Sequence, residues 1–181
     1  MAATYGEQRQ PAMQRYLKDI VYGANDGIVT TLVVIASVTG ASMSSTAVLV
    51  LGIANLIADG FSMGTSNVLA VRSTLTAESR PPFVAASRNG AATFIAFVLA
   101  GLIPLATYML PLGGNGIRFP AACLVAAVAL FAVGACRSLF SDRPWLVAGL
   151  EMLVLGTIAS AVAYGIGFAA AALVTLTGIG Q

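Results

Sequence analysis

The sequence predicts an all-α integral membrane protein with five transmembrane helices per protomer. Of its 181 residues, 58% are hydrophobic and only 9% are charged, whereas soluble proteins average about 45–50% apolar and about 25% charged residues. A spanning helix needs about 20 mostly apolar residues, and the chain contains five such stretches. They lie at residues 19–42, 46–71, 89–110, 119–140 and 145–175. Residues 1–18 form a polar N-terminal segment, and residues 176–181 form a short tail.

The segments between the spans contain residues that are typical of turns and helix starts. Gly40–Ser45 is a short polar turn, residues 72–88 are a polar stretch with two prolines, and Pro111–Gly116 is rich in glycine. Pro144 stands at the start of the fifth span, where the missing N–H of proline costs nothing. These joints support the division into five helices.

The basic residues predict the orientation in the membrane. Alternating crossings place eight of the nine Lys and Arg residues on the side of the N-terminus, and only Arg118 on the other. The eight are Arg9, Arg15, Lys18, Arg72, Arg80, Arg88, Arg137 and Arg143. Since basic residues favour the cytoplasmic side, we expect a cytoplasmic N-terminus and a C-terminus outside or in a lumen. The scattered placement argues against a nucleic-acid partner.

Asp26 and Asp59 lie inside the first two spans. A carboxylate near the bilayer centre costs at least ~2.5 kcal/mol on insertion scales, so it usually faces a bundle interior, a partner or an ion path. The two aspartates therefore make transport the first hypothesis.

The helical rise of 1.5 Å per residue gives a first estimate of depth. Measured from Lys18, Asp26 lies ~12 Å into the membrane, and measured from Arg72, Met63 lies ~13 Å and Asp59 ~20 Å deep. Measured from Arg143, Glu151 also lies ~12 Å into the membrane. We therefore expect Asp26, Met63 and Glu151 to share a layer.

A polar stripe accompanies Asp59 on the second span, because its members recur every three or four residues. It comprises Asn55, Asp59, Ser62, Met63, Ser66 and Asn67, and Asn25 adjoins Asp26 on the first span. Small residues four apart allow helices to approach closely. Such pairs, Gly23 with Gly27 and Gly60 with Gly64, predict that the first two helices pack together near the aspartates, and Asp-Gly steps also permit local unwinding.

Carboxylate, amide and thioether groups without any His suit a divalent cation such as Fe²⁺ or Mn²⁺, because the sulfur favours a transition metal. Carboxylates that release a metal ion can take up protons, which is the physical basis of metal–proton exchange. One protomer offers few ligands, so a two-fold dimer that brings together two copies of Asp26 and Met63 makes a better site. We expect no permanently bound cofactor.

Two segments closely resemble the signature segments of the vacuolar iron transporter family. They are Asp19-Ile-Val-Tyr-Gly-Ala-Asn-Asp-Gly-Ile28 and Gly52-Ile-Ala-Asn-Leu-Ile-Ala-Asp-Gly-Phe-Ser-Met-Gly64, with weaker likeness at Gly101–Leu105 and Gly149–Gly156. The resemblance implies a dimer of five-helix protomers that exports Fe²⁺, and often Mn²⁺, from the cytoplasm in exchange for protons. It places the ion path at the dimer interface, with Asp26 and Met63 as ion-binding residues.

The chain departs from the family pattern in two ways. Full-length vacuolar members carry a Glu-rich cytoplasmic domain between the second and third helices, but here that stretch is short and Glu78 is its only acid. In plant vacuolar members a glutamate stands at the position of Asn55. The chain therefore looks like the short bacterial-type members, and we expect a bacterial plasma membrane, with an organelle membrane as the alternative.

Three other functions are alternatives to the exporter. A passive metal channel would need the same ligands, and a membrane scaffold or sensor would use the polar groups only to hold helices together. An intramembrane aspartyl protease also needs two membrane aspartates, but its motifs resemble Tyr-Asp and Gly-x-Gly-Asp, whereas Asn25-Asp26 and Ala58-Asp59 stand here. We therefore expect a transporter and not an enzyme.

Overall fold

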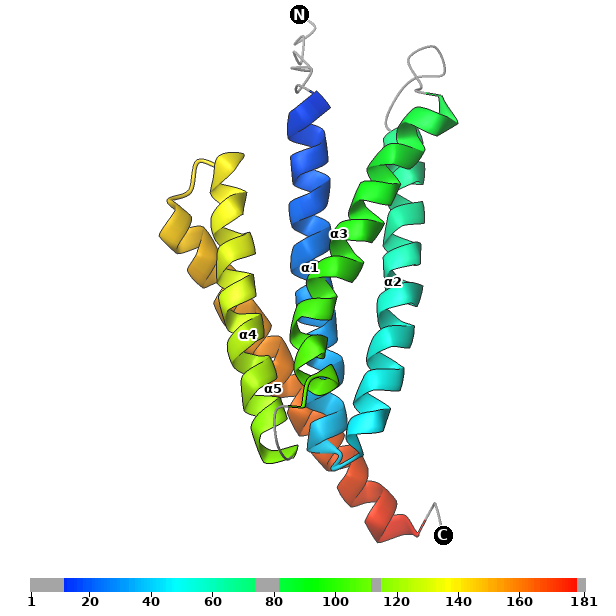
Figure 1. Ribbon diagram of the computed structural model, residues 1–181, viewed down its shortest axis with the longest axis vertical. Coiled ribbons are helices and arrows are strands. Elements are labelled where there is room, and N and C mark those ends of the chain that lie inside the picture. The colour runs from blue at the N-terminus through cyan, green and yellow to red at the C-terminus, as the bar shows by residue number, and fades with distance from the viewer. Residues whose placement is uncertain (1–11, 74–81, 112–114, 179–181) are drawn as a thin grey trace, which may run out of the picture.

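The computed structural model describes residues 12–73, 82–111 and 115–178, and the regular structure in these ranges is entirely helical (Figure 1). Five helices are long and apolar enough to cross a membrane, which confirms the predicted fold class. They are α1 (Ala12–Gly40), α2 (Ser45–Ser73), α3 (Phe83–Met109), α4 (Asn115–Cys136) and α5 (Trp145–Thr177), with a short 3₁₀ turn η1 (Arg137–Leu139) after α4.

The helices extend beyond the apolar stretches at several ends. α1 begins at Ala12 instead of residue 19, so the helix continues through residues 12–18. α3 begins at Phe83 instead of residue 89. Hydropathy marks where a helix meets the lipid, whereas the backbone hydrogen bonds continue into polar residues. Conversely, the 3₁₀ turn ends α4 earlier than residue 140.

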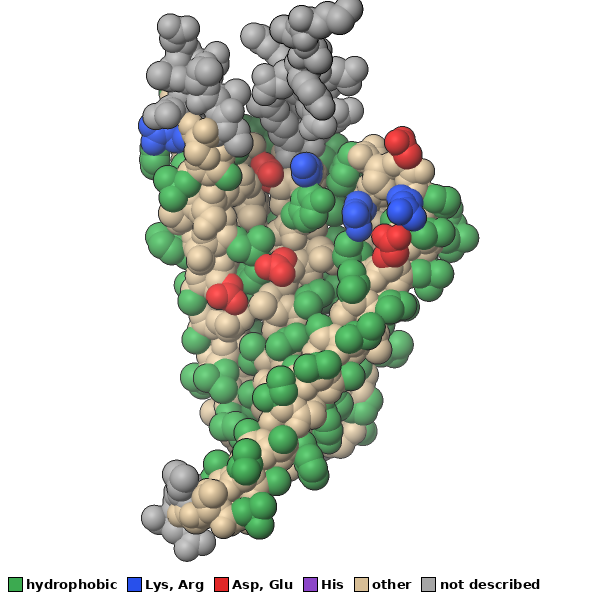
Figure 2. All heavy atoms as spheres, turned by 180° about the vertical axis from the view of Figure 1, so that it is seen from behind, with side chains coloured by type: hydrophobic (Ala, Val, Ile, Leu, Met, Phe, Trp, Pro, Cys, Tyr) green, Lys and Arg blue, Asp and Glu red, His purple; other side chains and the backbone are tan. Residues whose placement is uncertain are grey.

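Basic residues gather at one end of the bundle. The five helices alternate in direction, so α1, α3 and α5 start at the end where α2 and α4 finish (Figure 1). Basic side chains are visible near that end in Figure 2. Lys18, Arg72, Arg88, Arg137 and Arg143 occupy these helix ends, whereas Arg118 lies in the first turns of α4 at the opposite end. The side chains of Arg9, Arg15 and Arg80 lie outside the described residues, as does Glu78.

α1 is the central helix, because it contacts all four others, and α3 lies against both α1 and α2. Two buried clusters form the core. The first comprises Ile35, Val38, Val48, Leu56, Phe97, Leu105, Tyr108 and Ala122, and the second comprises Ile28, Leu32, Ala100, Ala126 and Leu130. Many large apolar side chains point outward, including Phe61 and Leu124 at 69% and 68% exposure. An apolar surface of this kind suits a lipid environment.

The glycine pairs of α1 and α2 pack against α3 and not against each other. A Cβ on Gly23 would meet the backbone of Thr93, and one on Gly27 would meet the backbone of Phe97. Gly60 and Gly64 also face α3, where they contact the Phe94 side chain. The expected close contact between these two glycine pairs is therefore wrong. Glycine spacing predicts a surface that permits close packing, but it does not identify the neighbouring helix.

The turn between α1 and α2 has well-defined hydrogen bonds. The N–H of Met43 donates to the carbonyl of Val38 (3.1 Å), and the N–H of Ser42 donates to that of Thr39 (2.9 Å), as in a Schellman motif. Ser42 takes the left-handed conformation, with φ 55°. Ser44 caps α2, because its Oγ accepts from the N–H of Ala47 (3.3 Å). Both helices are continuous through their Asp-Gly steps, so no local unwinding occurs there.

We predict that Gly27→Ala lowers the thermal stability of the protein. The added methyl would lie 2.9 Å and 3.0 Å from the Phe97 carbonyl carbon and Cα, and overpacking of this kind costs about 1–3 kcal/mol. Gly165→Ala is the matched control, because a Cβ there meets nothing within 4 Å. Thermal unfolding in detergent measures both variants, and equal melting temperatures would contradict the α1–α3 contact.

Candidate functional site

Asp26 and Asp59 lie at the same height in the bundle. Asp26 is fourteen residues before the end of α1, and Asp59 is fourteen residues after the start of α2, so both are ~21 Å from the shared turn. The glycines that follow them, Gly27 and Gly60, both contact Phe97. Depth estimates from Lys18 and Arg72 set Asp59 too far from Asp26, because Lys18 lies six residues inside α1, whereas Arg72 lies in the last turn of α2.

Neither carboxylate has a cationic partner among the described residues. Asp26 is exposed and Asp59 is half-buried. The hydroxyl of Thr30 donates to the backbone carbonyl of Asp26, so it does not engage the carboxylate. Figure 2 shows acidic side chains at mid-height on one face of the bundle, within the length of the helices that are apolar enough to span a membrane. Lipid would leave such charges unpaired, so this layer needs a non-lipid neighbour.

The rest of the predicted stripe lies on the same flank of α2. Asn55 and Met63 are half-buried, as Asp59 is, and Ser62 is exposed. Met63 follows Asp59 by one helical turn and packs against the core cluster that contains Phe97. Carboxylate, amide, hydroxyl and thioether groups thus occupy one continuous strip beside Asp26.

A second polar group joins three helices nearer the basic end. Asn89 on α3 donates to the Asp19 carboxylate on α1 (2.8 Å). Asn67 on α2 donates to the hydroxyl of Thr93 on α3 (2.6 Å), and Thr93 donates to the carbonyl of Asn89 (3.1 Å). The sequence analysis missed this link, although Asn89 and Thr93 stand four residues apart in an apolar span and so share a helix face.

Asn25 faces a different part of the bundle from the α2 stripe. It lines a small crevice between α1, α4 and α5 together with Tyr22, Arg137 and Met152. Its Oδ1 is buried and has no hydrogen-bond partner within the described ranges. The structure therefore separates Asn25 from Met63, although both were predicted to line one path.

Glu151 forms ion pairs at the corner between α4 and α5. Its carboxylate lies 3.7 Å from a guanidinium nitrogen of Arg137 and 3.7 Å from one of Arg143. All three side chains are partly exposed, with Arg143 the most exposed at 66%. Exposed ion pairs contribute only about 0–1 kcal/mol each, so they hold this corner together weakly.

Within the described residues, no three His, Cys, Asp or Glu side chains gather into a group that could hold a metal ion. Asp26, Asp59 and Met63 alone give one chain two carboxylates and one thioether. Transition metals usually take four to six ligands in proteins. A metal ion at this layer would therefore need further ligands beside these three side chains.

A model of the VIT family matches residues 17–82 and 75–168, which together make up most of the chain. The chain belongs to the VIT family. The matched region includes Asp26, Asp59 and Met63. The VIT family is a family of transporters and not of enzymes, so the expectation that the chain is not an enzyme is confirmed.

Several relatives of this VIT-family chain are named vacuolar iron transporters. One from Toxoplasma gondii (strain ATCC 50861 / VEG) is 47% identical over 49 residues, which are 27% of this chain and 16% of that protein. Vacuolar iron transporter 1 of Eucalyptus grandis is 25% identical and covers 82% of this chain and 84% of its own length. Vacuolar iron transporter homolog 2 of Oryza sativa subsp. japonica is 24% identical, with 86% and 90% covered. The chain thus spans a small part of the Toxoplasma relative and most of both plant relatives.

We predict that Asn67 and Thr93 are energetically coupled. Interhelical hydrogen bonds in membranes contribute about 0.6 kcal/mol on average and at most about 1.7 kcal/mol. A double-mutant cycle of Asn67→Ala and Thr93→Val, measured by unfolding in mixed micelles, should give a coupling energy in this range. Additive effects of the two substitutions would contradict the hydrogen bond.

Proposed function

We propose that this VIT-family protein exports Fe²⁺, and also Mn²⁺, from the cytoplasm in exchange for protons. Family membership and the names of its relatives support a metal-ion substrate. The observation that carries the proposal is the layer of Asp26 and Asp59, two carboxylates at one height within the spans and without a described cationic partner. Unpaired anionic groups inside a membrane suit a cation that passes through.

Asp26 and Met63 are the principal ligands in this proposal, and Asp59 lies beside them. The chain forms a two-fold homodimer whose interface carries the path, so each ligand occurs twice. Exposure of Asp26 and Ser62 on the single chain supports such an interface, since a second copy would cover these polar groups. Asn55 and Ser62 supply further oxygen ligands along the path.

Proton exchange follows from charge balance at this layer. When the metal leaves, the carboxylates of Asp26 and Asp59 have no cationic partner among the described residues, and proton uptake neutralises their charge. Two protons balance the charge of one Fe²⁺, so the exchange can be electroneutral. The same carboxylates then release the protons when the next metal ion binds.

The basic residues support an orientation of the chain in the membrane. Lys18, Arg72, Arg88, Arg137 and Arg143 share one end of the bundle with the start of α1, which supports a cytoplasmic N-terminus. The C-terminus then lies outside or in a lumen. We propose the bacterial plasma membrane, and the vacuolar names of the relatives favour the organelle membrane as the alternative.

We predict that proteoliposomes with the wild-type protein take up Fe²⁺, and that an imposed pH gradient drives the uptake. Asp26→Asn removes a ligand charge and Met63→Leu removes the thioether at nearly constant volume, so each should lower the uptake rate at least about tenfold, the effect of ~1.4 kcal/mol. Fluorescence quenching of a trapped metal indicator measures the rate. The same assay with Mn²⁺ tests the second substrate.

The controls are Asp142→Asn, an exposed carboxylate before α5, and Met109→Leu, an exposed thioether at the end of α3. Both should transport like the wild type. Uptake that ignores the pH gradient would indicate a passive channel instead. No uptake of either metal by a folded protein would favour the scaffold or sensor hypothesis.

Asn25 and Glu151 are secondary path residues in this proposal. The ion pairs of Glu151 with Arg137 and Arg143 lead us to predict that Glu151→Gln reduces Fe²⁺ uptake by less than about tenfold, because it loosens one corner without removing a central ligand. The same proteoliposome assay compares it with Asp26→Asn. Equal loss in both variants would instead make Glu151 a ligand of the transported ion.

A further inference from the structure

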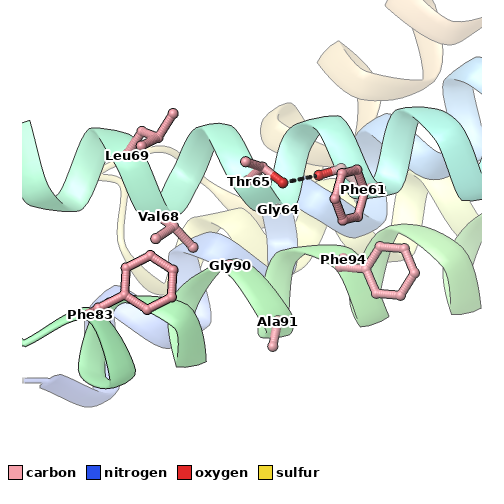
Figure 3. A pocket seen from close by; sticks show the side chains of 9 residues that line it. All are labelled: Phe61, Gly64, Thr65, Val68, Leu69, Phe83, Gly90, Ala91 and Phe94. Atoms are coloured by element: carbon pink, nitrogen blue, oxygen red, sulfur yellow. Dashed lines mark hydrogen bonds between the residues drawn. The ribbon is translucent and has the colours of Figure 1, made fainter.

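An apolar groove runs along α2 and α3 on the flank opposite the aspartates. Its volume is about 440 Å³, within the range of about 300–1,000 Å³ that is typical of small-molecule sites. The lining is aromatic and aliphatic, and Figure 3 shows how it is arranged. It consists of Phe61, Gly64, Thr65, Val68, Leu69, Phe83, Gly90, Ala91 and Phe94.

Two features define the shape of this groove. Gly64 and Gly90 form its floor, because a Cβ on Gly64 would lie 2.8 Å from the Gly90 carbonyl oxygen. Phe83 and Phe94 flank that crossing point along α3 (Figure 3). The only hydroxyl in the lining, that of Thr65, donates to the carbonyl of Phe61 (2.8 Å). The groove thus offers apolar contacts and no free polar group from its side chains.

Positive charge lies at one end of the groove. The Arg72 guanidinium is 5.4 Å from the ring centre of Phe83, which lines the groove. The Arg72 Nε is buried and has no hydrogen-bond partner within the described part of the chain. α3 begins at Phe83, with neither a side-chain cap nor an acidic residue in its first turn. A helix N-terminus and an arginine both attract anions.

We propose that this groove binds an anionic phospholipid. An acyl chain lies over the Gly64–Gly90 crossing, and the phosphate lies between Arg72 and the start of α3. This arrangement matches a lipid, whose charged headgroup is at the membrane surface and whose chain points toward the bilayer centre. The apolar lining contacts the acyl chain, and the charged end contacts the phosphate. A soluble anion would need only the charged end, and a purely apolar partner would need only the lining.

A second copy of the chain is a weaker candidate for the groove. Phe61 follows Asp59 by two residues, which is about 200° around a helix, and the buried residues Leu56, Gly60 and Gly64 separate the two flanks. A dimer formed through the aspartate flank leaves the groove facing lipid. The lipid proposal does not depend on metal transport.

Native mass spectrometry of the purified full chain tests the proposal directly. The protein is incubated with equal amounts of phosphatidylglycerol and phosphatidylcholine that have the same acyl chains. We expect the wild type to prefer phosphatidylglycerol by about fivefold, the contribution of one basic residue near an anionic lipid. Arg72→Gln should bind both lipids equally. Arg88→Gln removes the same charge from an exposed position outside the lining, so it should keep the preference.

Ala91→Trp fills the groove and tests the acyl-chain part. It should lower the binding of both lipids, while thermal unfolding in detergent shows that each variant remains folded. Equal binding of the two lipids by the wild type would overturn the proposal. So would a phosphatidylglycerol preference that survives in Arg72→Gln. A smaller particle mass in Ala91→Trp, with lipid binding unchanged, would show that a second copy occupies the groove instead.

Discussion

The placement of Asp26 and Asp59 in the spanning layer without a described cationic partner is the constraint on which the rest of the structure depends. Each such charge costs about 2.5–3.5 kcal/mol at the helix centre on insertion scales. Asp26 is exposed, so the core does not need it for packing. Folding stability therefore does not explain why an aspartate stands at position 26, whereas the binding of a cation at the exposed face would explain it. Glu151 differs, because two arginines already neutralise it.

α3 is the element that holds the two aspartate-bearing helices in register. Phe97 contacts both Gly27 and Gly60, and these glycines directly follow Asp26 and Asp59. Close packing without side chains at the glycines fixes the height of each helix against α3. The Gly40–Ser45 turn, which joins α1 to α2, fixes the same relative height of the two helices. The α3 contact and the turn thus both place the two carboxylates in one layer, as the proposed metal site requires.

The sequence was sufficient for the fold class but not for these contacts. Apolar length identified all five spans, although it missed residues 12–18 of α1, because polar residues continue a helix beyond the lipid. The spacing of Asp59 and Met63 predicted a shared face. The estimated depth of Asp59 relative to Asp26 was wrong, because Lys18 lies six residues inside α1, whereas Arg72 lies in the last turn of α2. The partner of Gly27 was equally hidden, because spacing within one helix does not name its neighbour.

The most direct test of the central claim is the number of Fe²⁺ ions bound per chain at equilibrium. Anaerobic dialysis of the purified protein against Fe²⁺, followed by colorimetric iron determination, measures it. Our account predicts a site that two chains complete, hence one central ion for every two chains, and the loss of this ion in Asp26→Asn. One ion per chain, or iron binding that persists unchanged in Asp26→Asn, would contradict the account.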